Sequence, residues 1–310
     1  MDKIVLLHSD SNRAYHTICH LEEMFGFLDI LQSFPYYPNH NNNNHPTSVA
    51  AVAATRMTNS SEDNNNDDDA DDAMAIIHMN ELDQACIELA IFFHDIIYNV
   101  KSSTNEEDSA LLLKEFLTEL SQLFTNNNNN NNNDNSIRID KEGNQKKRDD
   151  WNYFVERTSC YILATKSHNH HYKPSSSLSS FHNNHDREER YELGLALFLD
   201  ADMAVLGKTR LAYQHYAASI RIEYQHVPRS VYCEKRADIL ESFCSAVSND
   251  DDDDDDNQNQ NQNNPIKYIF ATNYMRTALE EQARTNLTLE IQSLREGIIP
   301  QERKTPPTTL

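Results

Sequence analysis

Long runs of asparagine and aspartate divide this 310-residue chain and limit the part of it that can form a hydrophobic core. Asparagine fills every position of 126–133, and aspartate fills every position of 250–256. Such tracts lack the apolar surface that would offset the entropy of ordering them. We therefore expect four disordered insertions, at 40–73, 125–149, 172–188 and 248–264.

The remaining segments hold roughly 200 residues, which is enough for one good core. We expect a single domain over 1–297, followed by a flexible tail at 298–310. The whole chain has only five glycines, so hairpin turns are scarce, and apolar residues recur at helical rather than alternating spacing. The sequence therefore predicts an all-α fold, a helical bundle interrupted by insertions.

The net charge of −22 comes largely from the low-complexity tracts. The segments 62–72 and 250–256 hold fourteen acidic residues, and without them the charge is about −8, ordinary for a globular domain. No basic stripe occurs, which argues against binding of duplex nucleic acid.

The cysteines and the apolar runs exclude several other classes. Five cysteines are scattered without a CxxC pair, so neither a disulfide framework nor a cysteine zinc site is predicted. The apolar run at the start is too short for a signal peptide, and no segment approaches membrane-spanning length. We expect a cytoplasmic protein that does not contact a membrane.

The stretch IFFHDIIY at 91–98 places a histidine and an aspartate inside an apolar run. Asn80 and Asp83 have the spacing of a capping box, so the helix that begins there delivers His94 and Asp95 near its C-terminal end. A buried carboxylate without a partner is costly. Either the two side chains form a helix-end hydrogen bond, or a cation compensates the charge.

Two other apolar segments carry residues of the same kind. His16 and His20 are four residues apart, which predicts that they share one helical face. Asp200 and Asp202 interrupt the apolar segment YELGLALFLDADMAVLG at 191–207. Imidazoles and carboxylates together suit a divalent transition metal, and only a helical bundle brings such distant ligands together. In the alternative, His16 is a surface histidine and Asp200 binds nearby backbone.

The order of these residues resembles that of the HD-domain superfamily, in particular its branch of predicted metal-dependent phosphohydrolases. Six motifs stand in that branch's order: YHTICH at 15–20, HD at 94–95, NEEDSA at 105–110, ATKSH at 164–168, DADMAVLG at 200–207 and IRIEY at 220–224. A lone HD is a weak signal, whereas six motifs in order are specific. The resemblance covers the segments between the insertions, and it implies an HD-type bundle.

The resemblance also implies a ligand set and one bound divalent ion, which could be Mn, Co, Ni, Fe, Zn or Mg. The ligands would be His20, His94, Asp95 and Asp202. His20 is preferred to His16 because Leu21 and Met24 continue its helix in the pattern of the superfamily. Asp202 is preferred to Asp200 because the last ligand of the superfamily commonly follows an alanine.

The remaining expected roles concern catalysis and substrate binding. Asp95, Glu106 or Glu107 would act on the proton of the attacking water. A small phosphorylated substrate would be held by His16, Lys166, His168 and Arg221. Simpler readings remain open, because acids are favoured at the start of a helix and Arg221 could pair internally with Glu223 or an aspartate of the site.

The favoured function is hydrolysis of a small phosphate ester or anhydride, with nucleotides among the candidates. Asn99 departs from the branch, where an aspartate is usual, and this motivates an alternative: a non-catalytic, metal-containing module that binds a phosphorylated ligand or partner. An interaction scaffold ranks last because it leaves the buried carboxylates unexplained.

Overall fold

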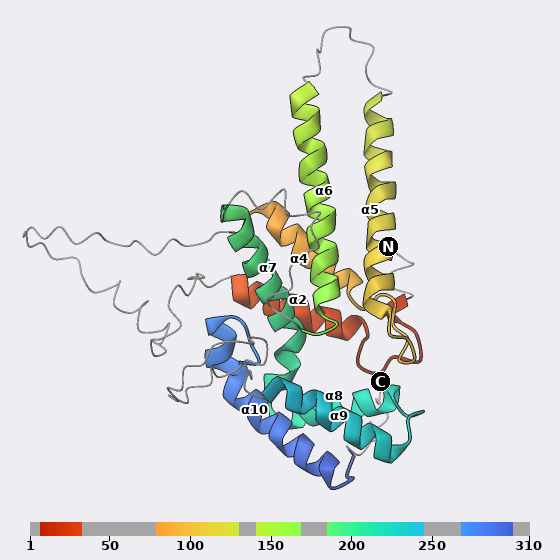
Figure 1. Cartoon of the computed structure of the whole chain (residues 1–310), viewed down its shortest axis with the longest axis vertical. Coiled ribbons are helices and arrows are strands. Elements are labelled where there is room, and N and C mark those ends of the chain that lie inside the picture. The colour runs from red at the N-terminus through yellow and green to blue at the C-terminus, as the bar shows by residue number, and fades with distance from the viewer. Residues whose placement is uncertain (1–6, 33–78, 130–140, 169–184, 245–267, 300–310) are drawn as a thin grey trace, which may run out of the picture.

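The computed structural model describes residues 7–32, 79–129, 141–168, 185–244 and 268–299 (Figure 1). Within these ranges the regular elements are helices and no strand occurs, so the prediction of an all-α fold is confirmed. None of the helices in the described ranges combines the length and the apolar character that a membrane crossing requires.

One half of the fold is built around α7, which packs against three other helices. The long helices α5 and α6 lie side by side, and α4 packs on α6 (Figure 1). The elements of this half are α2 (Ile18–Gln32), α4 (Glu81–Phe93), α5 (Asn105–Asn129), α6 (Lys141–Ala164) and α7 (His185–Met203).

The second half continues from the end of α7 through the short 3-10 helix η2. η2 contacts both α8 and α10, and α9 packs along α10 (Figure 1). The elements are η2 (Ala204–Gly207), α8 (Arg210–Glu223), α9 (Arg229–Cys244) and α10 (Asn273–Arg295). Buried apolar side chains from both halves form one continuous cluster, as expected for a single core.

Helix α4 begins and ends as the sequence predicts. The side chain of Asn80 accepts a hydrogen bond from the backbone of Asp83, whose own side chain accepts one from the backbone of Asn80. The helix ends at Phe93, and His94 is its C-cap residue. The Asp83 carboxylate is also buried against the guanidinium of Arg157 on α6, which ties the two helices together.

The insertion expected at 125–149 is narrower than predicted, because α5 continues to Asn129 and α6 already begins at Lys141. The segment 141–149 is rich in Lys, Arg, Glu and Gln, which are good helix formers and extend the apolar helix that follows. The insertion expected at 172–188 also ends early, since α7 begins at His185.

The expected tail begins later than residue 298. α10 ends in a Schellman motif, in which the N–H of Ile298 donates to the carbonyl of Ser293 and the N–H of Gly297 donates to that of Leu294, at 2.8 Å each. Gly297 has a φ of +74°, which glycine adopts without strain. Ile299 packs against the core. The insertions at 40–73 and 248–264, and residues 300–310, lie outside the described residues.

Candidate metal centre

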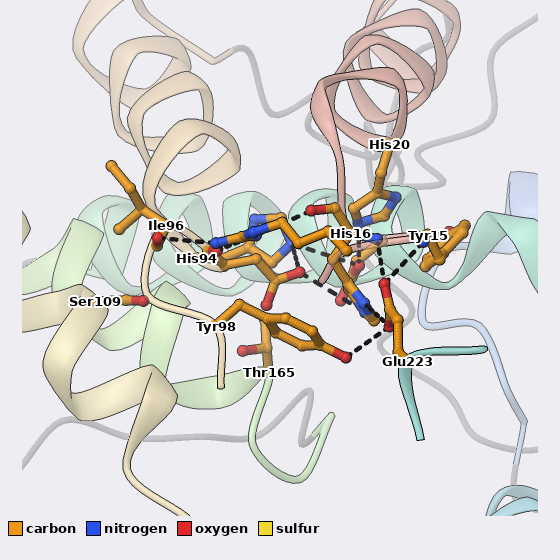
Figure 2. A network of polar contacts seen from close by, with 12 residues as sticks. Tyr15, His16, His20, His94, Ile96, Tyr98, Ser109, Thr165 and Glu223 are labelled. Carbon is orange, nitrogen blue, oxygen red and sulfur yellow. Dashed lines mark hydrogen bonds and ion pairs between the residues drawn. The ribbon is translucent and has the colours of Figure 1, made fainter. Parts of the chain in front are cut away.

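Three side chains from distant parts of the sequence meet beside α7. His20, His94 and Asp202 each offer one ligand atom, and these atoms lie within 4.8 Å of one another. His20 is in the first turn of α2, His94 follows the last turn of α4, and Asp202 is in the last turn of α7. Figure 2 shows the two imidazoles approaching each other from their separate helices.

The carboxylate of Asp202 lies between the two histidines. Its Oδ1 is 3.1 Å from Nε2 of His20 and 3.8 Å from Nε2 of His94. Both imidazoles are buried, and the Asp202 side chain is 14% exposed. The group is therefore largely withdrawn from solvent, and Asp202 is its most exposed member.

The backbone of α4 fixes the orientation of His94. Its Nδ1 lies 2.9 Å from the carbonyl oxygen of Ile91, which can only accept, so Nδ1 carries the hydrogen. The lone pair of the neutral ring is then on Nε2, the atom that faces Asp202. Metal-binding histidines usually hold their second ring nitrogen in this way.

Nε2 of His94 is buried and has no hydrogen-bond partner among the described residues. It lies 3.0 Å from Oδ2 of Asp95, but the two atoms are misaligned for a hydrogen bond. The pair is therefore a close contact of opposite charges rather than a well-aligned hydrogen bond. A buried lone pair beside an imidazole and a carboxylate fits a divalent cation of the Mn to Zn series, and three protein ligands leave positions for other molecules.

Asp95, the fourth expected ligand, lies beside this group. Its Oδ2 is near His94 and is 3.9 Å from Nε2 of His16. Burial raises the pKa of Asp95, but His94 and His16 outweigh it and hold the pKa well below its usual range. Burial lowers the pKa of His94, but Asp95 and Asp202 outweigh it and raise the pKa to about 9. The carboxylates thus stay charged and hold a proton on His94, and a divalent cation bound here would displace that proton and take up the Nε2 lone pair.

The second oxygen of Asp202 faces His168, whose Nε2 lies 3.1 Å from Oδ2. Burial raises the pKa of Asp202, but the hydrogen bonds from His168 and His20 lower it well below the usual range. The backbone of His168 has a φ of +47°, which is uncommon for a residue other than glycine. His168 thus borders the group directly, at the point where the described part of α6 and its following turn end.

His16 does not share a helical face with His20, contrary to the prediction. α2 begins only at Ile18, because the carboxylate of Glu223 accepts the backbone N–H groups of the preceding segment. The two rings are nevertheless neighbours, with centroids 5.9 Å apart. His16 therefore lies next to the candidate site although it is outside the helix.

Glu223 was not among the site residues predicted from the sequence. Its Oε2 lies 2.8 Å from Nδ1 of His16 and accepts a hydrogen bond from the hydroxyl of Tyr98 at 2.7 Å (Figure 2). The sequence does contain a signal for Glu223, because it is an acid inside the IRIEY motif and beside an apolar stripe of the same helix. The sequence analysis gave the weight of that motif to Arg221 instead.

Arg221 turns to the end of α8. Its Nη1 donates to the carbonyl oxygens of Tyr224 at 2.8 Å and Val227 at 3.1 Å, and its guanidinium lies 4.7 Å from the centre of the Tyr232 ring. Arg221 therefore binds carbonyl groups just after the last turn of α8 and stabilises the end of that helix. Within the described ranges Arg221 pairs with neither Glu223 nor an aspartate, contrary to the internal pair expected from the sequence.

Two further expected site residues contact each other. Lys166 forms an ion pair with Glu107, and both side chains are close to half exposed. Lys166 also donates to the carbonyl oxygen of Ser103 at 2.8 Å. Glu106, beside this pair in the first turn of α5, has no described contact with the metal group. The roles of Lys166, Glu106 and Glu107 stay predictions.

Asp200, two residues before Asp202, is fully buried and serves the backbone. Its carboxylate accepts the N–H groups of Ala271 and Thr272 at 2.7 and 2.8 Å, and the Thr272 hydroxyl at 2.6 Å, just before α10 begins. Burial raises its pKa to about 7 despite these donors. The preference for Asp202 as the ligand agrees with this arrangement, since Asp200 faces α10.

Asn99 organises the loop between α4 and α5. Its Oδ1 accepts the N–H of Lys101 at 3.0 Å, and its backbone exchanges two hydrogen bonds with the side chain of Asn105. Asparagine and aspartate both form such a turn. An aspartate at this position would accept the same N–H, so asparagine preserves the one side-chain contact described here.

Arg13 binds the backbone next to the site and was also not predicted from the sequence. It donates to the carbonyl oxygens of His16 and Asp95, at 2.9 and 2.7 Å, and to that of Ile96 at 3.0 Å. No spacing pattern identifies such a residue, because its partners are backbone atoms far along the chain.

Comparisons of the chain with protein-family models, curated proteins and solved structures gave no match.

Proposed function

We propose that the protein is a metal-dependent phosphohydrolase that acts on a small phosphate ester or anhydride. The observation that carries the proposal is the group formed by His20, His94 and Asp202, in which the backbone orients Nε2 of His94 toward Asp202. The resemblance of six ordered motifs to the HD-domain superfamily supports the same conclusion.

A divalent cation at this position would supply Lewis-acid chemistry, lowering the pKa of a water molecule and polarising a phosphoryl oxygen. Asp95 lies directly beside the group, so its carboxylate can accept a proton from the attacking water. His16 and His168 border the group on two sides, at Asp95 and at Asp202. They can donate hydrogen bonds to the non-bridging oxygens as charge develops there.

The remaining expected residues have weaker support. Lys166 would have to leave Glu107 before it could bind a phosphate oxygen, and the guanidinium of Arg221 is already used by backbone carbonyls. We therefore propose that His16 and His168, before the other candidates, stabilise the negative charge that develops in the transition state. Glu107 remains a candidate for orienting water, because its ion pair is exposed and is easily exchanged.

The experiment is an assay of phosphate release from a generic phosphomonoester and a panel of nucleotides, with Mn²⁺, Co²⁺, Ni²⁺ and Mg²⁺ supplied separately. We expect turnover with at least one metal, and its loss in Asp95→Asn while the circular dichroism stays helical. Glu280→Gln is the control, since Glu280 is a buried carboxylate outside the site. Turnover that persists in Asp95→Asn would exclude this mechanism.

The non-catalytic alternative, a module that keeps its ion for structure, is favoured by the burial of the group. His20 and His94 are 3% and 2% exposed, and structural metal sites are typically closed. It predicts bound metal and raised thermal stability with no turnover of any substrate in the panel.

A further inference from the structure

Glu223 makes an unusually complete set of contacts for one carboxylate. Oε1 accepts the backbone N–H groups of Ala14 and Tyr15 at 2.8 Å and that of His16 at 3.1 Å. Oε2 faces Nδ1 of His16 and accepts from the hydroxyl of Tyr98. The carboxylate itself is fully buried, so these contacts are shielded from water.

These contacts determine the direction in which the His16 ring points. A carboxylate can only accept, so Nδ1 of His16 donates to Glu223, and Nε2 faces the opposite way, toward Asp95 at 3.9 Å. In the doubly protonated ring, which two flanking carboxylates favour, Nε2 also carries a hydrogen and can donate it to a phosphoryl oxygen. The rings of Tyr98 and Tyr15 lie against the imidazole, with centroids 4.3 and 5.0 Å away (Figure 2). The side chain is 19% exposed, so a ligand at the metal group can reach it.

We propose that Glu223 is a positioning residue, which aims Nε2 of His16 at the phosphoryl group of a substrate bound at the metal group. This inference rests on the proposed function, because it takes a phosphate as the ligand of His16. It adds an assignment that the motif alone does not give: the acid of IRIEY acts on the substrate through His16, and the arginine of the same motif ends the helix.

A purely architectural reading of Glu223 is possible, because its Oε1 also anchors three backbone groups. Glu280 shows what that role alone looks like. Its carboxylate accepts the backbone N–H groups of Ile269 and Phe270 at 3.1 to 3.3 Å and pairs with Arg284 at 2.8 Å, and no contact with a histidine of the site is described. Glu280→Gln is therefore a matched control for the loss of a buried carboxylate that holds a loop.

The test is a double-mutant cycle read by the binding of inorganic phosphate to the full-length, Mn²⁺-loaded protein, measured by calorimetry. The variants are His16→Ala, Glu223→Gln and the double variant. If Glu223 acts through His16, each single change weakens phosphate binding by roughly tenfold, the loss expected for a charge-assisted hydrogen bond, and the double variant binds no more weakly than His16→Ala. Metal content stays at the native level in all three.

The outcomes separate the inference from the function on which it rests. Two results overturn the positioning role if the native protein binds phosphate: additive losses in the double variant, or no loss in Glu223→Gln. Either result leaves the proposed function standing. Phosphate affinity that falls equally in Glu280→Gln also overturns it. No phosphate binding by the native, metal-loaded protein overturns the proposed function as well.

A second variant keeps the test decisive if Glu223→Gln does not fold. Tyr98→Phe removes one hydrogen bond to Oε2 of Glu223 and leaves the backbone contacts in place. We expect it to weaken phosphate binding in the native background and to have no effect when His16 is already alanine. An equal effect in both backgrounds would contradict a role exerted through His16.

Discussion

Nδ1 of His94 is bonded to the carbonyl oxygen of Ile91, one turn earlier in the same chain, at 2.9 Å. This single contact decides which nitrogen of the ring is free, and the free nitrogen is the one beside Asp202 and Asp95. The helix that delivers the HD pair thus also sets the tautomer of its histidine. The orientation of Nε2 toward these carboxylates follows from the place where α4 ends.

Removing His94 tests the ligand group against a matched histidine. His94→Ala should reduce bound metal well below one equivalent, because it takes away a ligand whose lone pair is already oriented. His8→Ala is the control: His8 is equally buried and bonds to the carbonyl of Phe92 at 3.1 Å, but it is outside the ligand group. The His8→Ala variant should have a lower thermal stability than the native protein and should retain its metal. Elemental analysis distinguishes the two, and equal metal loss in both would contradict the assignment.

The two aspartates of the DAD sequence should behave differently when each is changed to asparagine. Asp200→Asn leaves a buried donor before α10 without its acceptor and should cost about 1–3 kcal/mol of stability, with metal content unchanged. Asp202→Asn should abolish metal binding instead. Thermal denaturation with and without added Mn²⁺ measures both effects. Mn²⁺ stabilisation that survives in Asp202→Asn would be evidence against the site.

Packing between α6 and α7 depends on the absence of a side chain at Gly194. A Cβ there would collide with the hydroxyl of Tyr161 and would come within 3.0 Å of the Arg157 guanidinium. Gly194→Ala should therefore destabilise the protein by roughly 1–3 kcal/mol. Gly26→Ala is the comparison, because it lies in α2 with open space around it and should stabilise by about 0.5–1 kcal/mol. Chemical denaturation gives both values, and equal effects would exclude this close contact.

The Glu223 contacts predict a specific loss of stability in acid. Burial raises the pKa of Glu223, but hydrogen bonds from His16, the backbone and Tyr98 lower it to about 2, against an ordinary value of 4.5. The unfolded chain therefore binds the proton first as the pH falls, so this stabilisation is complete above about 4.5 and is lost toward pH 2. The stability difference between native protein and Glu223→Gln should shrink over that window. A difference independent of pH would contradict the contacts.

Local patterns in the sequence predict much of this fold. Helix formation depends mainly on residues that are close in sequence. The helices accordingly reflect the capping box of Asn80 and Asp83, the helical spacing of the apolar residues and the scarcity of glycine. The boundaries near 125–149 were wrong because charged helix formers lack the apolar face from which the helices were recognised.

The site was only partly predictable for a related reason. His20, His94 and Asp202 stand in motifs, and their meeting follows from burial and charge. The non-helical segment at His16 could not be predicted in this way. What keeps it out of α2 is Glu223, which lies more than 200 residues away in the sequence. Arg13 escaped notice in the same way, since it recognises backbone carbonyls that carry no sequence signal.

The most direct test of the central claim is anomalous X-ray diffraction from crystals grown with Mn²⁺ or Co²⁺, recorded on both sides of the metal absorption edge. We predict one strong peak at about 2.0–2.2 Å from Nε2 of His20, Nε2 of His94 and a carboxylate oxygen of Asp202, the usual distances for such ligands. A crystal that contains the metal in solution but shows no anomalous peak at these three residues would contradict the account.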